Sequence, residues 1–171
     1  MLGKIIGSVR RNHALEHATV SILMGRLGPG VRMVGRATGN GFYVYGDVPT
    51  DRVEESAAEG LERLKRGEAA LAVSPLCGTN LAVAGLLAGA SSLLALGNRS
   101  RLERLPNVLL SAMVAVLAAQ PLGRLVQRYI TTSPDLADME IVGIRRGEHG
   151  VARYHKVETR QRGSQVKETP P

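Results

Sequence analysis

Two long stretches without a charged residue constrain the fold of this chain more than any other feature. Neither residues 69–98 nor residues 105–123 contain any Asp, Glu, Lys or Arg. An uninterrupted apolar stretch of that length is typical of a helix that crosses a bilayer. As a helix, residues 75–97 would be roughly 35 Å long, which is enough to span a membrane with some tilt. The sequence therefore predicts two membrane-spanning helices, at 75–97 and at about 105–122.

The two predicted spans form a hairpin, because the connector at 98–104 is too short for anything but antiparallel neighbours. Ser74 and Pro75 have the residue types of an N-cap and a first helical position, so they mark the start of the first span. Gly85 and Gly89 give that span a G-x-x-x-G face. Such a face either mediates formation of a homo-oligomer or packs against the second span of the same chain.

The basic residues near the spans predict the topology, since the more basic flanks of a membrane protein stay in the cytoplasm. Five basic residues flank the hairpin on the side of the termini, and three lie in the connector: Arg63, Lys65, Arg66, Arg124 and Arg128 against Arg99, Arg101 and Arg104. We therefore expect a protein integral to the inner cell membrane, with two spans in the lipid bilayer and both termini in the cytoplasm.

The segment before the hairpin has the pattern of a small α and β fold. A helix is predicted at about 10–27, where a Gly-Pro-Gly sequence follows it, and alternating residues at 31–45 predict a β-hairpin. A second helix is predicted to begin with a capping box of Asp51 and Glu54 and to stop at Gly67.

Behind the second span, residues 139–144 and 151–157 predict two further strands, which could join the first hairpin in one sheet. The predicted fold is an α+β soluble cap, made of a helix, a β-hairpin, a helix and a C-terminal β-hairpin, with an inserted two-helix transmembrane hairpin. The expected divisions are a soluble αββα segment, the transmembrane hairpin, the C-terminal strands and a polar, disordered tail: 1–68, 69–128, 129–159 and 160–171.

The excess of basic residues raises the question of an anionic partner. The net charge is +7, but the cations are scattered along the chain and only 3% of the residues are aromatic. Few rings are thus available to stack on bases. For a chain with two spans we expect the basic flanks to face anionic lipid headgroups, and we expect no nucleic acid as a partner.

The most specific chemical signal is the sequence His13-Ala14-Leu15-Glu16-His17 inside the first predicted helix. His13 and His17 are about one turn apart and share a face, which Glu16 borders. Two neutral imidazoles on adjacent turns can bind Zn²⁺ or a similar divalent metal, and a nearby carboxylate can take a proton from a bound water. The motif therefore predicts His13 and His17 as metal ligands and Glu16 as the catalytic base.

The order H-x-x-E-H resembles that of the inverzincin metalloproteases, the insulysin and pitrilysin family, in which two His and a distal Glu bind zinc. It is also similar to the motif of S-ribosylhomocysteine lyase, whose metal site is completed by a distant cysteine. This second resemblance implies that Cys77, the one cysteine of the chain, is the third ligand. Cys77 falls in the first turn of the predicted span, where the helix dipole favours a thiolate. An acidic residue, His149 and His155 are alternative ligands.

A longer resemblance rests on two sequences, Asn-His-Ala-Leu-Glu-His-Ala-Thr at 12–19 and Cys-Gly-Thr-Asn at 77–80. Together with the overall layout they are similar to an uncharacterised bacterial family of small two-span membrane proteins, known as a domain of unknown function. That resemblance supports the architecture and implies no activity.

Two functions are compatible with these residues. The first is a membrane-anchored, metal-dependent hydrolase of peptidase type, with an H-x-x-E-H site at the membrane surface. The alternative is a non-catalytic membrane scaffold or interaction protein, in which His13, Glu16 and His17 form a structural cluster or hold a structural metal.

Overall fold

A computed structural model of the chain describes residues 2–28, 30–96, 104–149 and 152–162. The fold divides into two compact units. Residues Met1–Val73 and Thr132–Pro171 form the first, here called the α+β unit, and residues Ser74–Thr131 form the second, the helical unit.

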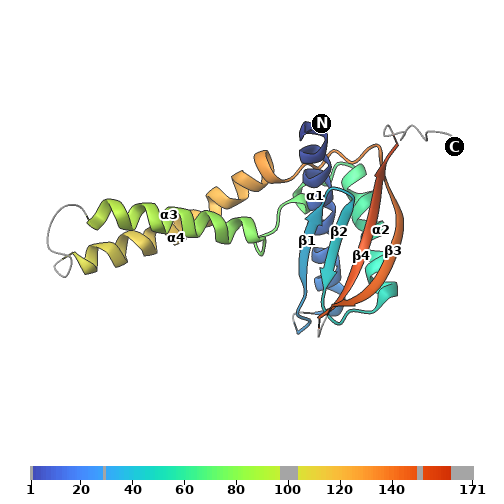
Figure 1. Cartoon of the computed structure of the whole chain (residues 1–171), viewed down its shortest axis with the longest axis horizontal. Coiled ribbons are helices and arrows are strands. Elements are labelled where there is room, and N and C mark those ends of the chain that lie inside the picture. The colour runs from blue at the N-terminus through green and yellow to red at the C-terminus, as the bar shows by residue number, and fades with distance from the viewer. Residues whose placement is uncertain (1, 29, 97–103, 150–151, 163–171) are drawn as a thin grey trace. The chain divides into compact units, whose positions relative to one another are not determined.

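The α+β unit contains one antiparallel sheet with the strand order β1-β2-β4-β3 (Figure 1). The strands are β1 (Val34–Thr38), β2 (Gly41–Tyr45), β3 (Met139–His149) and β4 (Ala152–Gln161). Since β2 pairs with β4, the two hairpins lie in one sheet although about a hundred residues separate them. Helix α1 (Leu2–Leu27) packs against β1 and β2, and α2 (Thr50–Lys65) contacts β3 and β4 on the same face of the sheet. The predicted mixed α+β fold is confirmed.

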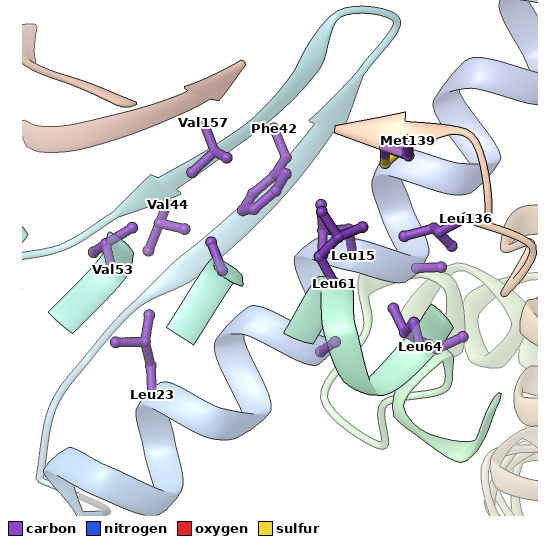
Figure 2. Packing of buried hydrophobic residues seen from close by; sticks show 14 of the residues in the cluster. Leu15, Leu23, Phe42, Val44, Val53, Leu61, Leu64, Leu136, Met139 and Val157 are labelled. Atoms are coloured by element: carbon purple, nitrogen blue, oxygen red, sulfur yellow. The ribbon is translucent and has the colours of Figure 1, made fainter. Parts of the chain in front are cut away.

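The core lies between this sheet and its two helices (Figure 2). Phe42 and Val44 of β2 and Val157 of β4 are fully buried, and they meet Leu15 and Leu23 of α1. Each buried side chain of this size stabilises the fold by roughly 1.5–3 kcal/mol. The alternation of strand residues turns the neighbouring side chains of β2 to the opposite face of the sheet.

Two helix starts in the α+β unit differ from the prediction. Helix α1 begins at Leu2 rather than near residue 10, because no Pro interrupts the helical spacing of the residues before it. Helix α2 begins at Thr50 with Pro49 at the N-cap, and no side chain caps it. The predicted capping box of Asp51 and Glu54 is therefore wrong: Asp51 lies in the first turn, where its charge still favours the helix dipole.

The end of α2 is as predicted. Gly67 has a φ of +91°, and its N–H bonds to the carbonyl of Leu64, as expected for a glycine that ends a helix. A short 3₁₀ turn, η1 (Ala69–Ala72), follows and packs against α1.

The helical unit consists of α3 (Gly78–Leu96), α4 (Leu105–Val126) and a single π-helical turn, η2 (Gln127–Thr131). Helix α3 begins at Gly78 rather than Pro75, because residues 74–77 form a turn closed by a bond from Cys77 N to Ser74 O of 3.3 Å. Helix α4 continues past Pro121 to Val126, beyond the predicted end of the second span at about residue 122. The predicted connector lies largely outside the described residues.

Buried polar groups join α3 to α4. Gln127, fully buried, bonds to the backbone N–H and carbonyl of Ser74 at 2.8 and 3.0 Å, and to Asn80 Oδ1 at 2.8 Å. Gly123 lets Asn80 approach closely, since a Cβ at Gly123 would lie 2.2 Å from Asn80 Oδ1. This network fixes the turn before α3 against the end of α4.

Gly85 and Gly89 take no part in this packing. Among the described residues, no atom lies within 4 Å of a Cβ built at either position. Their face of α3 is therefore open, and its use in homo-oligomer formation stays a prediction.

By length and composition, two of the described helices could cross a membrane: Gly78–Leu96, with 19 residues, and Leu105–Thr131, with 27. Only 6% and 17% of their most apolar windows are buried. At the other end of the chain, β4 extends to Gln161, past the predicted start of the tail, and residues 163–171 lie outside the described residues.

Candidate metal centre

Helix α1 brings the two imidazoles and the carboxylate of the motif together. The ring centroids of His13 and His17 are 4.4 Å apart. One carboxylate oxygen, Glu16 Oε2, lies 3.8 Å from His13 Nε2 and 3.9 Å from His17 Nε2. The side chains of Glu16 and His17 are 8% and 3% exposed and that of His13 is 18% exposed. Solvent therefore reaches the cluster from the side of His13.

A backbone carbonyl fixes the tautomer of His17. His17 Nδ1 lies 2.8 Å from the carbonyl oxygen of Ala72 in η1. A carbonyl can only accept, so Nδ1 carries the proton and donates it, which leaves the lone pair of the neutral ring on Nε2. Metal-binding histidines commonly donate their second ring N–H to a backbone carbonyl in this way. The nitrogen that faces Glu16 is thus the one able to bind a metal.

Gly35 makes room for the carboxylate of Glu16. A Cβ at this position of β1 would lie 1.7 Å from Glu16 Oε1 and 2.3 Å from its Cδ. Any other residue would therefore displace the carboxylate. A lone glycine inside an alternating strand is a sign of such a close approach, but the sequence did not show what approaches.

Asn12, the first residue of the motif, ties α1 to the sheet. Its Nδ2 donates to Thr38 O at 2.8 Å, and its Oδ1 accepts from Thr159 Oγ1 at 2.6 Å. Asn12 is 1% exposed, so both bonds are shielded from water. They hold the helix that carries His13 across β1 and β4, a role to which the local sequence gives no clue.

The remaining predicted site residues are not part of helix α1. Cys77 belongs to the helical unit, where it directly precedes α3 and its Sγ accepts from Thr79 N at 3.4 Å. The prediction that Cys77 lies inside the first turn is therefore off by one position, because the helix starts late. The side chain of His149 lies outside the described residues.

His155, the other alternative ligand, is placed by α2. Its Nε2 lies 3.0 Å from Thr50 Oγ1, and the residue is 1% exposed. Burial lowers the pKa of His155 below its ordinary value; the positive charge of Arg146 adds to this effect, and Glu54 opposes it. His155 is accordingly a neutral core residue.

The residues on α1 fit a divalent metal. Ligand nitrogens of His13 and His17 lie within 4.8 Å of each other. Glu16 Oε2 lies 3.8 and 3.9 Å from the two nitrogens, farther than the roughly 3.3 Å between two ligand atoms of one tetrahedral zinc ion. It is close enough to accept a proton from a water molecule bound to an ion that the two imidazoles hold.

Comparison with known proteins gives a family without an activity. A model of the family described as a domain of unknown function (DUF6391) matches residues 8–144, a range that includes the motif and the whole helical unit. An uncharacterised protein of a Picosynechococcus species is 35% identical over 138 residues. These cover 73% of this chain and 66% of that protein, so the chain spans just under two thirds of the relative it matches. No solved structure matches.

Proposed function

This chain belongs to the DUF6391 family, and because that family has no described activity we propose from the chain's own residues that it is a membrane-anchored, metal-dependent hydrolase of peptidase type. His13 and His17 hold Zn²⁺ or a similar divalent ion, and Glu16 is the general base. The family membership agrees with the expected uncharacterised family, whereas the membrane anchoring and the role of the motif belong to this proposal.

One observation carries the proposal: two imidazole nitrogens flank the same carboxylate oxygen at 3.8 and 3.9 Å, inside a largely buried cluster. When bound, the ion would lower the pKa of a coordinated water to near neutrality and polarise a carbonyl. Glu16 would accept the proton of that water and pass it to the leaving group. The hydrogen bond from His17 to the Ala72 carbonyl would hold the imidazole, and the space at Gly35 would hold the Glu16 carboxylate, so that the two face each other.

Cys77 is the proposed third ligand. The α+β unit holds Ala72 against His17, and Cys77 follows Ala72 by five residues, which span at most about 18 Å. Connectivity alone therefore restricts Cys77 to the neighbourhood of the imidazoles. The bond from Thr79 N to its sulfur would favour the thiolate that a metal needs.

The proposed anchor is the helical unit, inserted as two spans with both termini in the cytoplasm of the inner membrane. Its outer surface supports this, because large apolar side chains such as Leu86, Leu94 and Leu117 are 74%, 83% and 73% exposed. Exposure of so much apolar surface to water would be costly, whereas lipid accepts it. The protein should stay in the membrane fraction after an alkaline carbonate wash; release by carbonate would refute the anchor.

Metal analysis of the protein purified in detergent tests the site itself. We expect about one divalent ion per folded chain, and we expect His13→Ala and His17→Ala to lose it. Circular dichroism of each variant checks that loss of metal is not loss of fold. A fully folded wild-type chain that binds no divalent metal at micromolar concentration would refute the proposal.

Reconstitution with Co²⁺ tests the third ligand. A cysteine ligand gives an intense sulfur-to-cobalt charge-transfer absorption, which should disappear in Cys77→Ser while the imidazole site keeps weaker binding. If the wild-type spectrum lacks this band, the third ligand is not Cys77.

Glu16→Gln separates catalysis from a structural role. The variant should keep its metal but lose hydrolysis of a mixed library of quenched fluorescent peptides, because an amide cannot act as the base. Glu62→Gln, on the exposed side of α2, is the matched control and should change neither. If the wild-type chain binds metal and no substrate in the library is cut, the alternative of a scaffold with a structural metal is favoured.

A further inference from the structure

The face of the sheet opposite α1 and α2 carries a cluster of three tyrosines. Side chains alternate along a strand, and Phe42 and Val44 of β2 point into the core. The side chains on the opposite face of the sheet therefore include Tyr43 and Tyr45 of β2 and Tyr154 of β4. The ring centroids are 5.9 Å apart for Tyr43 and Tyr45, 5.5 Å for Tyr43 and Tyr154, and 5.8 Å for Tyr45 and Tyr154. All three residues are partly exposed.

A row of cations crosses the same face beside these rings. The strand register places Arg36, Tyr43, Lys156 and Arg145 side by side across β1, β2, β4 and β3. Lys156 Nζ lies 4.3 Å from the centre of the Tyr43 ring, and its bonds to Thr38 Oγ1 and Asn40 Oδ1 hold it there. The guanidinium groups of Arg36 and Arg145 are exposed, although Arg145 also pairs with Glu158.

The charge of this face is positive. Its described side chains include four cations and two anions: Arg36, Arg145, Lys156 and Arg160 against Glu140 and Glu158. On strand β3, Gly147 leaves space for the ring of Tyr154, since a Cβ there would lie 2.5 Å from that ring. Rings and guanidinium groups thus lie side by side on the face of the sheet opposite α1 and α2.

We propose that this face binds single-stranded nucleic acid, with bases stacked on Tyr43 and Tyr45 and phosphates paired with Arg36 and Arg145. Aromatic rings beside a positive surface are the recurring means of binding an unpaired strand, because every base has a ring face and every nucleotide a negative charge. In the sequence, the cations are scattered and aromatic residues are few, so the sequence predicted no nucleic acid as a partner. The fold, however, brings three of the chain's four tyrosines together with a row of cations.

A lipid surface is the other anionic occupant to consider. The three clustered, partly exposed rings favour a nucleic acid, because each base offers a ring face for stacking and a phospholipid headgroup offers none.

Fluorescence polarisation with the full chain in a neutral detergent tests the proposal. The probe is a fluorescein-labelled single-stranded DNA of about 20 nucleotides, and the same sequence as a duplex serves as a comparison. We expect the single strand to bind more tightly than the duplex, whose bases cannot stack on a protein ring. Between about 50 and about 200 mM salt, log K should fall against log salt with a slope of about −1.4, as for two phosphate contacts.

Variants assign the binding to this face. Tyr45→Ala should weaken it by about 5- to 150-fold, whereas Tyr45→Phe, which keeps the ring, should restore it. Arg36→Gln should weaken binding and reduce the salt slope by about half. The matched controls Tyr129→Ala and Arg52→Gln, in η2 and α2, should leave the affinity unchanged.

Three results would overturn the proposal. The first is no binding of the single strand at low salt, and the second is binding to which Tyr45→Ala and Arg36→Gln make no difference. The third is binding to vesicles that contain phosphatidylglycerol, sensitive to these same substitutions, without binding of the oligonucleotide; this would assign the face to a lipid surface. Because Arg36 is exposed and its substitution leaves the core intact, the test stands even if a tyrosine variant fails to fold.

Discussion

Replacement of Gly35 by Ala tests whether the position of Glu16 matters. The added Cβ would lie 1.7 Å from Glu16 Oε1, and ordinary van der Waals contact begins at 3.4 Å, so the oxygen must retreat by about 1.7 Å. Overpacking of this kind costs about 1–3 kcal/mol, which is less than the roughly 5–15 kcal/mol by which most domains are stable. The variant should therefore fold with its carboxylate moved away from one or both imidazoles.

The expected consequences can be measured separately. Displacement of a group that orients metal ligands typically lowers metal affinity by about 10- to 100-fold, and loss of a positioned base lowers turnover by about 10²- to 10⁴-fold. Competition with a chromophoric chelator gives the affinity, and chemical denaturation gives the free energy of unfolding. Gly39→Ala is the matched control, because no described atom lies within 4 Å of a Cβ there and its φ is not positive. If Gly35→Ala binds metal and turns over substrate like the wild type, the geometry around Glu16 has no functional role.

Three further substitutions test other parts of the structure. Asn12→Ala removes both bonds that tie α1 to β1 and β4 and should lower the free energy of unfolding by about 1–3 kcal/mol, measured in urea; an unchanged value would contradict this. Gln127→Leu leaves the Ser74 N–H and Asn80 Oδ1 without their hydrogen-bond partner and should lower the melting temperature in detergent. Gln120→Leu, at an exposed site on α4, should leave that temperature unchanged. Because burial lowers the pKa of His155, its neutral form stabilises the fold fully above the unfolded pKa of about 6.5, and this stability is lost as the pH falls below that value. Denaturation at neutral pH and at about pH 5 should thus show a smaller loss for His155→Phe than for the wild type.

The parts of the fold that local sequence predicts are those governed by a repeat along the chain. The alternation at 31–45 predicted a hairpin, and uncharged composition predicted two long apolar helices, both of which the structure contains. Helix boundaries were less well predicted. The spacing of Asp51 and Glu54 predicted Asp51 as the N-cap of α2, but the N-cap is Pro49. Helix α3 begins later than predicted because residues 74–77 form a closed turn.

The contacts that complete the site come from residues far apart in the sequence. The carbonyl that fixes His17 is 55 residues away, and the hydroxyl that bonds to Asn12 is 147 residues away. No periodic pattern links such residues, because only the pairing of β2 with β4 and the packing of η1 against α1 bring them together. The same pairing sets Tyr45 beside Tyr154, which the sequence did not suggest.

The sequence by itself determined that His13, Glu16 and His17 share one face of a helix, because the α-helical repeat fixes the spacing of residues three and four apart. It also determined that two long apolar helices form, since their composition leaves no polar face; the structure places them at Gly78–Leu96 and Leu105–Val126. Only the tertiary structure decided which way His17 donates its proton, what lies against Glu16 and which side chains share the open face of the sheet. These depend on strand register and on packing between distant segments, and both are settled by the burial of the whole core rather than by any stretch of chain alone.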